Sequence, residues 1–129
     1  MTEEFVTLET AKLLKEKGFK EDVFTFYEVD CVEGDMILSE TYDESENFNE
    51  KNDCLSAPSQ SLAQKWLRET KNIHICVYNC ACGYGYEISK ADNGTHITSS
   101  TYEGTNDGGE WDTYEEALEA GIKECLKLI

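Results

Sequence analysis

Basic residues, histidine, proline and long apolar runs are all scarce in this sequence. Its 129 residues include 11 lysines and arginines, 27 aspartates and glutamates, 2 histidines and 1 proline, and the formal net charge is −16. A surface so poor in cations argues against direct nucleic-acid binding, which requires lysine and arginine opposite the phosphates. The same deficit disfavours docking on an anionic membrane. No apolar run approaches the roughly 20 residues that a membrane span needs.

The first residues show neither the basic start nor the apolar stretch of a secretory signal, so we expect a cytoplasmic protein. Reduced thiols are the expectation in that compartment, although an even number of cysteines could pair in an oxidising one. The six cysteines are Cys31, Cys54, Cys76, Cys80, Cys82 and Cys125. Cys125 falls on the apolar stripe of the last expected helix, where it acts as a small core side chain.

Apolar spacing predicts three helices, at residues 8–17, 58–70 and 114–129. Thr7 is placed to cap the first helix, and Gly18 supplies the left-handed residue that ends it. Pro58, the only proline, suits the first turn of the second helix, where no amide donor is needed. Thr113 and Glu116 have the spacing of a capping box at the start of the third.

Runs rich in β-branched and aromatic residues predict strands at 23–29, 36–42, 73–78, 83–89 and 95–102. Tight turns, such as Asn93-Gly94 between the last two, indicate antiparallel neighbours. The order is α-β-β-α-β-β-β-α. We therefore expect residues 1–129 to form a single α+β domain, in which three helices cover an antiparallel sheet of about five strands. An acidic loop is expected near residues 43–57.

The negative charge is concentrated in two segments. Residues 21–55 hold twelve acidic side chains against Lys51 alone, and residues 91–119 hold eight without any lysine or arginine. Such fields attract basic partners and repel nucleic acid, although an acidic surface can also serve solubility alone. The partner that this surface would suit is a basic protein. The residues proposed to form the acidic surface are Asp30, Glu33, Asp35, Asp43, Glu44 and Glu46.

A different class of function, a small enzyme or metal-binding protein, would use the histidines and a cysteine cluster. If the strand is straight, Cys76, Cys80 and Cys82 point to one side together with His74, and converging thiolates bind zinc. The C-x3-C-x-C spacing differs from that of zinc ribbons, however, and the pattern favours small residues packing under a helix. His74 and His96 could also meet across the sheet and, with a carboxylate, perform acid–base chemistry. A third hypothesis is a structural component that self-associates.

Three segments together carry a resemblance to known sequences. They are TAKLLKEKGF at residues 10–19, APSQSLAQKWLRE at 57–69 followed by Asn72-Ile73, and YEEALEAGI at 114–122. The set resembles a family of small uncharacterised proteins from Bacteroides-type bacteria, their prophages and phages, and the likeness covers most of the chain outside residues 43–55. The resemblance implies an intracellular accessory protein and transfers no catalytic residue, cofactor or metal. We therefore expect a non-catalytic, phage- or prophage-type protein that binds a basic protein through its acidic surface.

Overall fold

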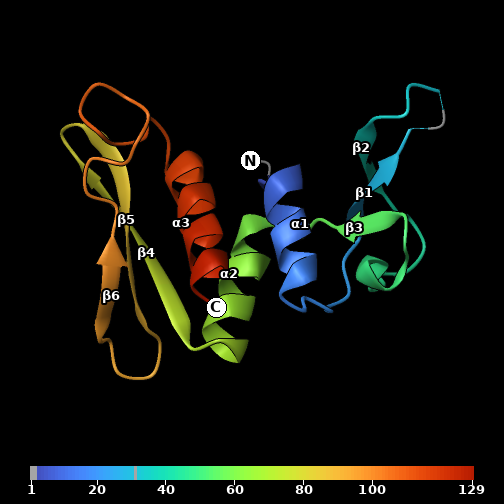
Figure 1. Ribbon diagram of the computed structural model, residues 1–129, viewed down its shortest axis with the longest axis horizontal. Helices are drawn as coiled ribbons and strands as arrows, with labels where there is room; N and C mark the ends of the chain where they lie inside the picture. Colours follow the sequence, from blue (N-terminus) through green and yellow to red (C-terminus); the bar gives the residue numbers. More distant parts are fainter. Residues whose placement is uncertain (1–2, 31) are drawn as a thin grey trace. The chain divides into compact units, whose positions relative to one another are not determined.

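The computed structural model describes residues 3–30 and 32–129, so Cys31 lies outside the described residues. The chain divides into two compact units, the first ending at Ser59 and the second beginning at Gln60 (Figure 1). The elements of the first unit are α1 (Leu8–Glu16), β1 (Thr25–Val29), β2 (Met36–Glu40), the 3-10 helix η1 (Phe48–Glu50) and β3 (Cys54–Ser56). Those of the second are α2 (Gln60–Thr70), β4 (Ile73–Cys80), β5 (Gly83–Lys90), β6 (His96–Ser99) and α3 (Tyr114–Leu128).

The first unit is built on a three-stranded antiparallel sheet in the order β2-β1-β3. Helix α1 begins as predicted, because the Thr7 side chain accepts a hydrogen bond from the Thr10 amide. It also ends as predicted, since Gly18 adopts a φ of 91° that few other residues tolerate. The Lys15 ammonium ties the helix to β3 by donating to the carbonyl of Cys54.

Both short elements of the first unit, η1 and β3, lie inside the acidic segment that was expected to be a loop. Phe48 of η1 is buried and stacks on Phe26 of β1, with ring centroids 4.0 Å apart. Asn49 joins the segment to its surroundings, because its amide donates to the carbonyl of Phe19 and accepts from the amide of Ser56. The other buried apolar residues described in this unit are Val6, Ala11, Leu14, Phe19, Val23, Cys54 and Ala57.

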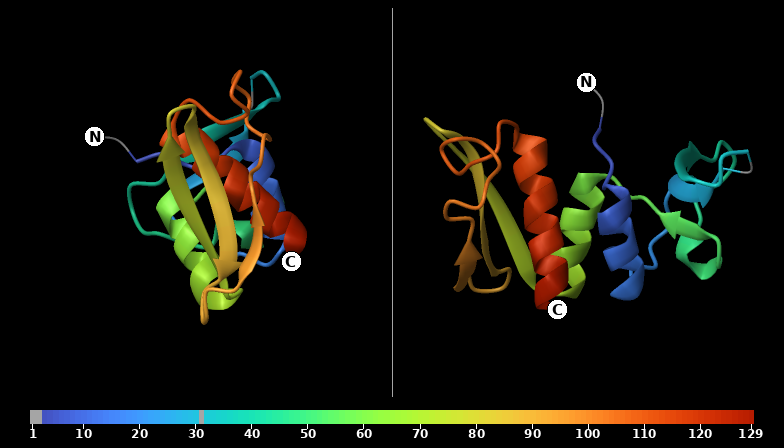
Figure 2. Two further views of the ribbon diagram at one scale, coloured as in Figure 1. Left: turned by 90° about the vertical axis from the view of Figure 1, so that its left-hand side faces the viewer. Right: turned by 45° about the horizontal axis from the view of Figure 1, so that its top comes forward.

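The second unit consists of a three-stranded antiparallel sheet, β4-β5-β6, with α2 and α3 against one of its faces (Figure 2). Thr113 caps α3 as predicted, because its hydroxyl accepts from the Glu116 amide at 3.1 Å. The Glu116 carboxylate accepts from that same hydroxyl at 2.9 Å, rather than from the Thr113 backbone amide as in a full capping box. Gly121 brings α3 close to the sheet, since a Cβ there would lie 3.1 Å from a methyl carbon of Ile75. Ile88, Ile122, Cys125 and Leu126 are fully buried in this core.

The α+β class and the three helices are confirmed, but the expected single sheet of about five strands is not what the described residues form. In the described part of the chain, six strands form two sheets of three. The additional strand is β3, which occupies the second edge of β1 and so completes the first sheet. Its three residues are too few to carry an alternating pattern. The single-domain organisation of residues 1–129 stays a prediction.

Candidate functional site

The predicted acidic surface centres on the hairpin formed by β1 and β2, which we call the acidic hairpin (residues 25–46). The strands pair without a bulge from Val29 opposite Met36 to Thr25 opposite Glu40. At the turn, the Asp30 amide donates to the carbonyl of Asp35, and the Asp30 carboxylate accepts from the amide of Val32. The carboxylate of Asp30 is therefore partly engaged in holding the turn.

The six predicted acidic residues lie in two groups at opposite ends of this hairpin. Asp30, Glu33 and Asp35 belong to the turn, whereas Asp43, Glu44 and Glu46 follow the far end of β2. Because β2 is an extended segment of five residues, the groups are separated by roughly 17 Å of strand. The structure thus places an acidic group beyond each end of β2 rather than one continuous acidic patch.

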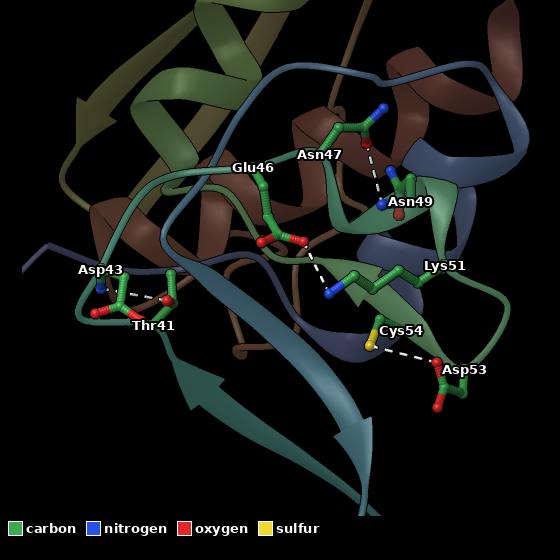
Figure 3. A network of polar contacts seen from close by, with 8 residues as sticks. All are labelled: Thr41, Asp43, Glu46, Asn47, Asn49, Lys51, Asp53 and Cys54. Carbon is green, nitrogen blue, oxygen red and sulfur yellow. Dashed lines mark hydrogen bonds and ion pairs between the residues drawn. The ribbon is translucent and has the colours of Figure 1, made fainter.

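Asp43 and Glu46 of the second group make polar contacts with their neighbours (Figure 3). The carboxylate of Glu46 lies 2.8 Å from the ammonium of Lys51, and this hydrogen bond raises the pKa of Lys51. The backbone of Glu46 also pairs with that of Val23. The charge of Glu46 is therefore compensated within the protein. Among the six predicted acids, it is the one for which the described chain shows a lysine or arginine partner.

Exposed apolar side chains on the same hairpin are a feature that the sequence analysis missed. Leu38 is 47% exposed and its neighbour Ile37 is 41% exposed, although adjacent strand residues face opposite sides of a sheet. Val29 and the turn residue Val32 are exposed as well. The run Met36-Ile37-Leu38 has no polar–apolar alternation, and that absence is the signal that could have distinguished this strand from a half-buried one.

The two histidines do not meet across the second sheet. His74 of β4 and His96 of β6 both pair with Ser89, from opposite sides, so two strand spacings, roughly 9–10 Å, separate them. His96 instead contacts Glu87, with 3.1 Å between Nδ1 and Oε1, at an exposed position. Cys76 of β4 lies opposite Glu87 of β5 and is exposed.

The three clustered cysteines are all exposed but are not gathered into one site. Strand alternation places His74, Cys76 and Cys80 on one face of β4, as expected. Cys76 and Cys80 are nevertheless about 13 Å apart along the strand. Cys82 lies in the following turn, beside Gly108. Within residues 3–30 and 32–129, no three His, Cys, Asp or Glu side chains are placed to hold a metal ion.

Comparison of the chain with family models, with curated proteins and with solved structures finds no match. The resemblance to the Bacteroides-type family therefore stays a prediction. Over the part of the chain that the structure describes, no helix has the length and apolar character to cross a bilayer. Function is therefore inferred from the chemistry of the surface.

Proposed function

We propose that this protein is a non-catalytic accessory protein, of phage or prophage type, that binds a basic protein through its acidic hairpin. The phage-related part depends on the sequence resemblance alone. The observation that carries the binding role is the combination of exposed apolar side chains and unpaired carboxylates on one hairpin. Residues 21–50 contain no lysine or arginine, and Lys51, the first cation after the hairpin, is engaged by Glu46.

Charge alone would be compatible with a role in solubility, but the apolar side chains are not. Leu38 and Val29 lie on one face of the paired strands, Ile37 lies on the other face, and all three expose apolar surface to water. A contiguous exposed apolar patch with a polar rim is typical of a protein-binding site. The carboxylates at both ends would accelerate the approach of a basic partner and oppose the approach of an acidic one.

Two variants with equal net charge test this role. The hairpin variant carries Glu33→Gln, Asp43→Asn and Glu44→Gln. The control variant carries Asp92→Asn, Asp107→Asn and Glu115→Gln, three exposed positions of the second unit. Wild type and both variants are immobilised and presented with a bacterial lysate at about 50 mM salt, where electrostatic attraction is weakly screened. The basic protein that wild type retains is identified, and its dissociation constant is measured with each form.

We expect the hairpin variant to bind the retained protein at least about tenfold more weakly, and the control variant to bind it like wild type. Raising the salt to about 0.5 M should weaken binding to wild type because the charges are then screened. Equal losses in the two variants would show that only net charge matters and would refute a site on the hairpin. Retention of no basic protein by wild type at low salt would refute the function itself.

A further inference from the structure

We infer that the free edge of β2 receives an extended basic segment of the partner as an additional β-strand. This inference rests on the function proposed above and specifies how the acidic hairpin binds. It depends on three features of the hairpin: unpaired backbone groups along one edge, exposed side chains on both faces, and carboxylates beyond both ends of the strand.

Two hydrogen bonds that flank the strands show which residue pairs of the β1–β2 ladder are hydrogen-bonded. The Asp30 amide donates to the carbonyl of Asp35 at one end, and the Thr41 amide donates to the carbonyl of Phe24 at the other. Hydrogen-bonded and non-hydrogen-bonded pairs alternate along an antiparallel ladder. Every second residue of β2, counted from Asp35, therefore directs its backbone groups toward β1.

Ile37 and Ser39 are the residues of β2 whose backbone amide and carbonyl groups point toward β1. They lie opposite Glu28 and Phe26. Met36, Leu38 and Glu40 accordingly direct their amide and carbonyl groups away from β1. The sheet order is β2-β1-β3, so β2 is an edge, and no strand of the described chain pairs with its outer side. These outward groups form a row that another strand can match.

Strand β2 lacks several of the devices that keep sheet edges unpaired. Its sequence, Met-Ile-Leu-Ser-Glu, contains no lysine or proline, and its pairing with β1 has no bulge. Leu38 is exposed on one face and Ile37 on the other. An added strand would cover part of both side chains, so it would bury apolar surface in addition to forming backbone hydrogen bonds.

Charge complementarity identifies the occupant as a basic segment. Glu33 and Asp35 precede β2, while Glu40, Asp43 and Glu44 lie at its end and beyond. A segment with lysine or arginine at both ends and apolar residues between them would place opposite charges next to each other. A second copy of this chain, paired through its own β2, would instead bring two sets of carboxylates together without any cation between residues 21 and 50.

A defined peptide tests the inference on the full chain. The probe is the capped, fluorescein-labelled peptide Lys-Lys-Val-Ile-Val-Lys-Lys, and its binding is measured by fluorescence anisotropy at about 50 mM salt. The first control peptide has the same sequence with N-methyl groups on the three central residues. These groups remove the backbone donors from both edges of the peptide but leave its charge unchanged. The second control peptide has glutamate in place of every lysine.

Two protein variants separate the contribution of the Leu38 backbone amide to binding from that of the Leu38 side chain. Leu38→Pro removes the outward amide at the centre of the edge, a position where edge strands tolerate proline. Leu38→Ala removes the same side chain and keeps that amide. Far-UV circular dichroism confirms that both variants are folded. Hydrogen exchange of wild type, followed by NMR, reports directly on the amides of Met36, Leu38 and Glu40.

We expect the basic peptide to bind wild type at least about tenfold more tightly than either control peptide. Leu38→Pro should bind it about tenfold more weakly than Leu38→Ala does. In the complex, the three outward amides should exchange at least about tenfold more slowly. Slower exchange at these amides when the free protein is concentrated, together with a dimer that Leu38→Pro abolishes, would identify a second copy as the occupant and overturn the inference.

The results also distinguish this inference from the proposed function. Equal affinity for the basic peptide and its N-methylated form would refute strand addition, but it would leave charge-driven binding by the hairpin intact. Failure of the basic peptide to bind at low salt would refute this inference alone. The proposed function would then still be judged by the hairpin and control variants in the lysate experiment.

Discussion

Thiol reactivity should divide the five described cysteines into a fast group and a slow group. Cys76, Cys80 and Cys82 are exposed, whereas Cys54 and Cys125 are buried. Native protein is treated at about pH 8 with a thiol-specific reagent such as Ellman's reagent. The protein carries Cys31→Ser, because Cys31 lies outside the described residues. Three equivalents should react quickly, and two should react only after unfolding in urea.

The expected magnitude follows from the environment of Cys125. Burial, reinforced by the nearby Glu124 carboxylate, raises the pKa of this thiol from 9.0 to about 12. Because only the thiolate reacts, the reactive fraction at about pH 8 falls from about 10% to about 0.01%, which is roughly a thousandfold decrease. Burial also raises the pKa of Cys54, so this thiol belongs to the slow group as well.

Peptide mapping by mass spectrometry assigns the label to individual cysteines at each time point. As a control, Cys76→Ser should remove one fast equivalent and leave the slow group unchanged. Labelling of native Cys125 within about tenfold of the rate at Cys76 would contradict the packing of α3 against β4 and β5. It would show that this helix leaves the sheet often enough to expose its buried face.

Two further predictions concern stability. Thr113→Ala should lower the free energy of unfolding in urea by about 1 kcal/mol, because it removes the acceptor of the Glu116 amide. Thr101→Ala, at an exposed position outside the helices, should change it much less, and equal losses would contradict the capping role. Alkaline pH should destabilise the protein, since burial raises the pKa of Cys125 and of Tyr86 in the folded state. The stabilisation is complete below the ordinary pKa, which is 9.0 for Cys125 and 10.0 for Tyr86, and is lost above it, at up to about 1.4 kcal/mol per pH unit per group. Urea titrations that give the same stability at about pH 9 and pH 11 would contradict this.

The helices and the second sheet could be predicted well because their signals are local. Thr7 and Gly18 bound α1 within one residue of the expected ends, and Thr113 marks the start of α3. The alternation of Ile73, Ile75 and neighbouring residues predicted β4, which the structure extends to Cys80. Caps, turns and periodicity each require only a few consecutive residues, so one sequence is enough to recognise them.

The division into two sheets could not be predicted, because it depends on contacts between distant residues. Strand β3 is held by its pairing with β1 and by the hydrogen bonds of Asn49 to Phe19 and Ser56. None of these partners is recognisable from the three residues of the strand. An acidic segment rich in asparagine has the composition of a loop, and here long-range contacts override that local preference.

The candidate site was predicted in composition but not in arrangement. The excess of carboxylates in residues 21–55 is evident from the sequence, whereas their division between the two ends of β2 depends on the register of the hairpin. The common face of His74, Cys76 and Cys80 was correctly predicted from alternation. Whether these side chains form a metal site could not be predicted from their spacing. Such a site requires neighbouring strands to bring further ligands to the same point.

The carboxylates at the ends of β2 also account for how an exposed apolar edge strand can remain unpaired in the free protein. An exposed apolar edge strand is normally a route to aggregation, and natural sheets protect such edges with charges. Here the carboxylates beyond both ends would repel a second copy while attracting a basic segment. The hairpin variant with Glu33→Gln, Asp43→Asn and Glu44→Gln should therefore self-associate at concentrations where wild type and the equally charged control variant do not. Light scattering measures this directly. Equal association of both variants would show that net charge, rather than its position beside β2, keeps the edge unpaired.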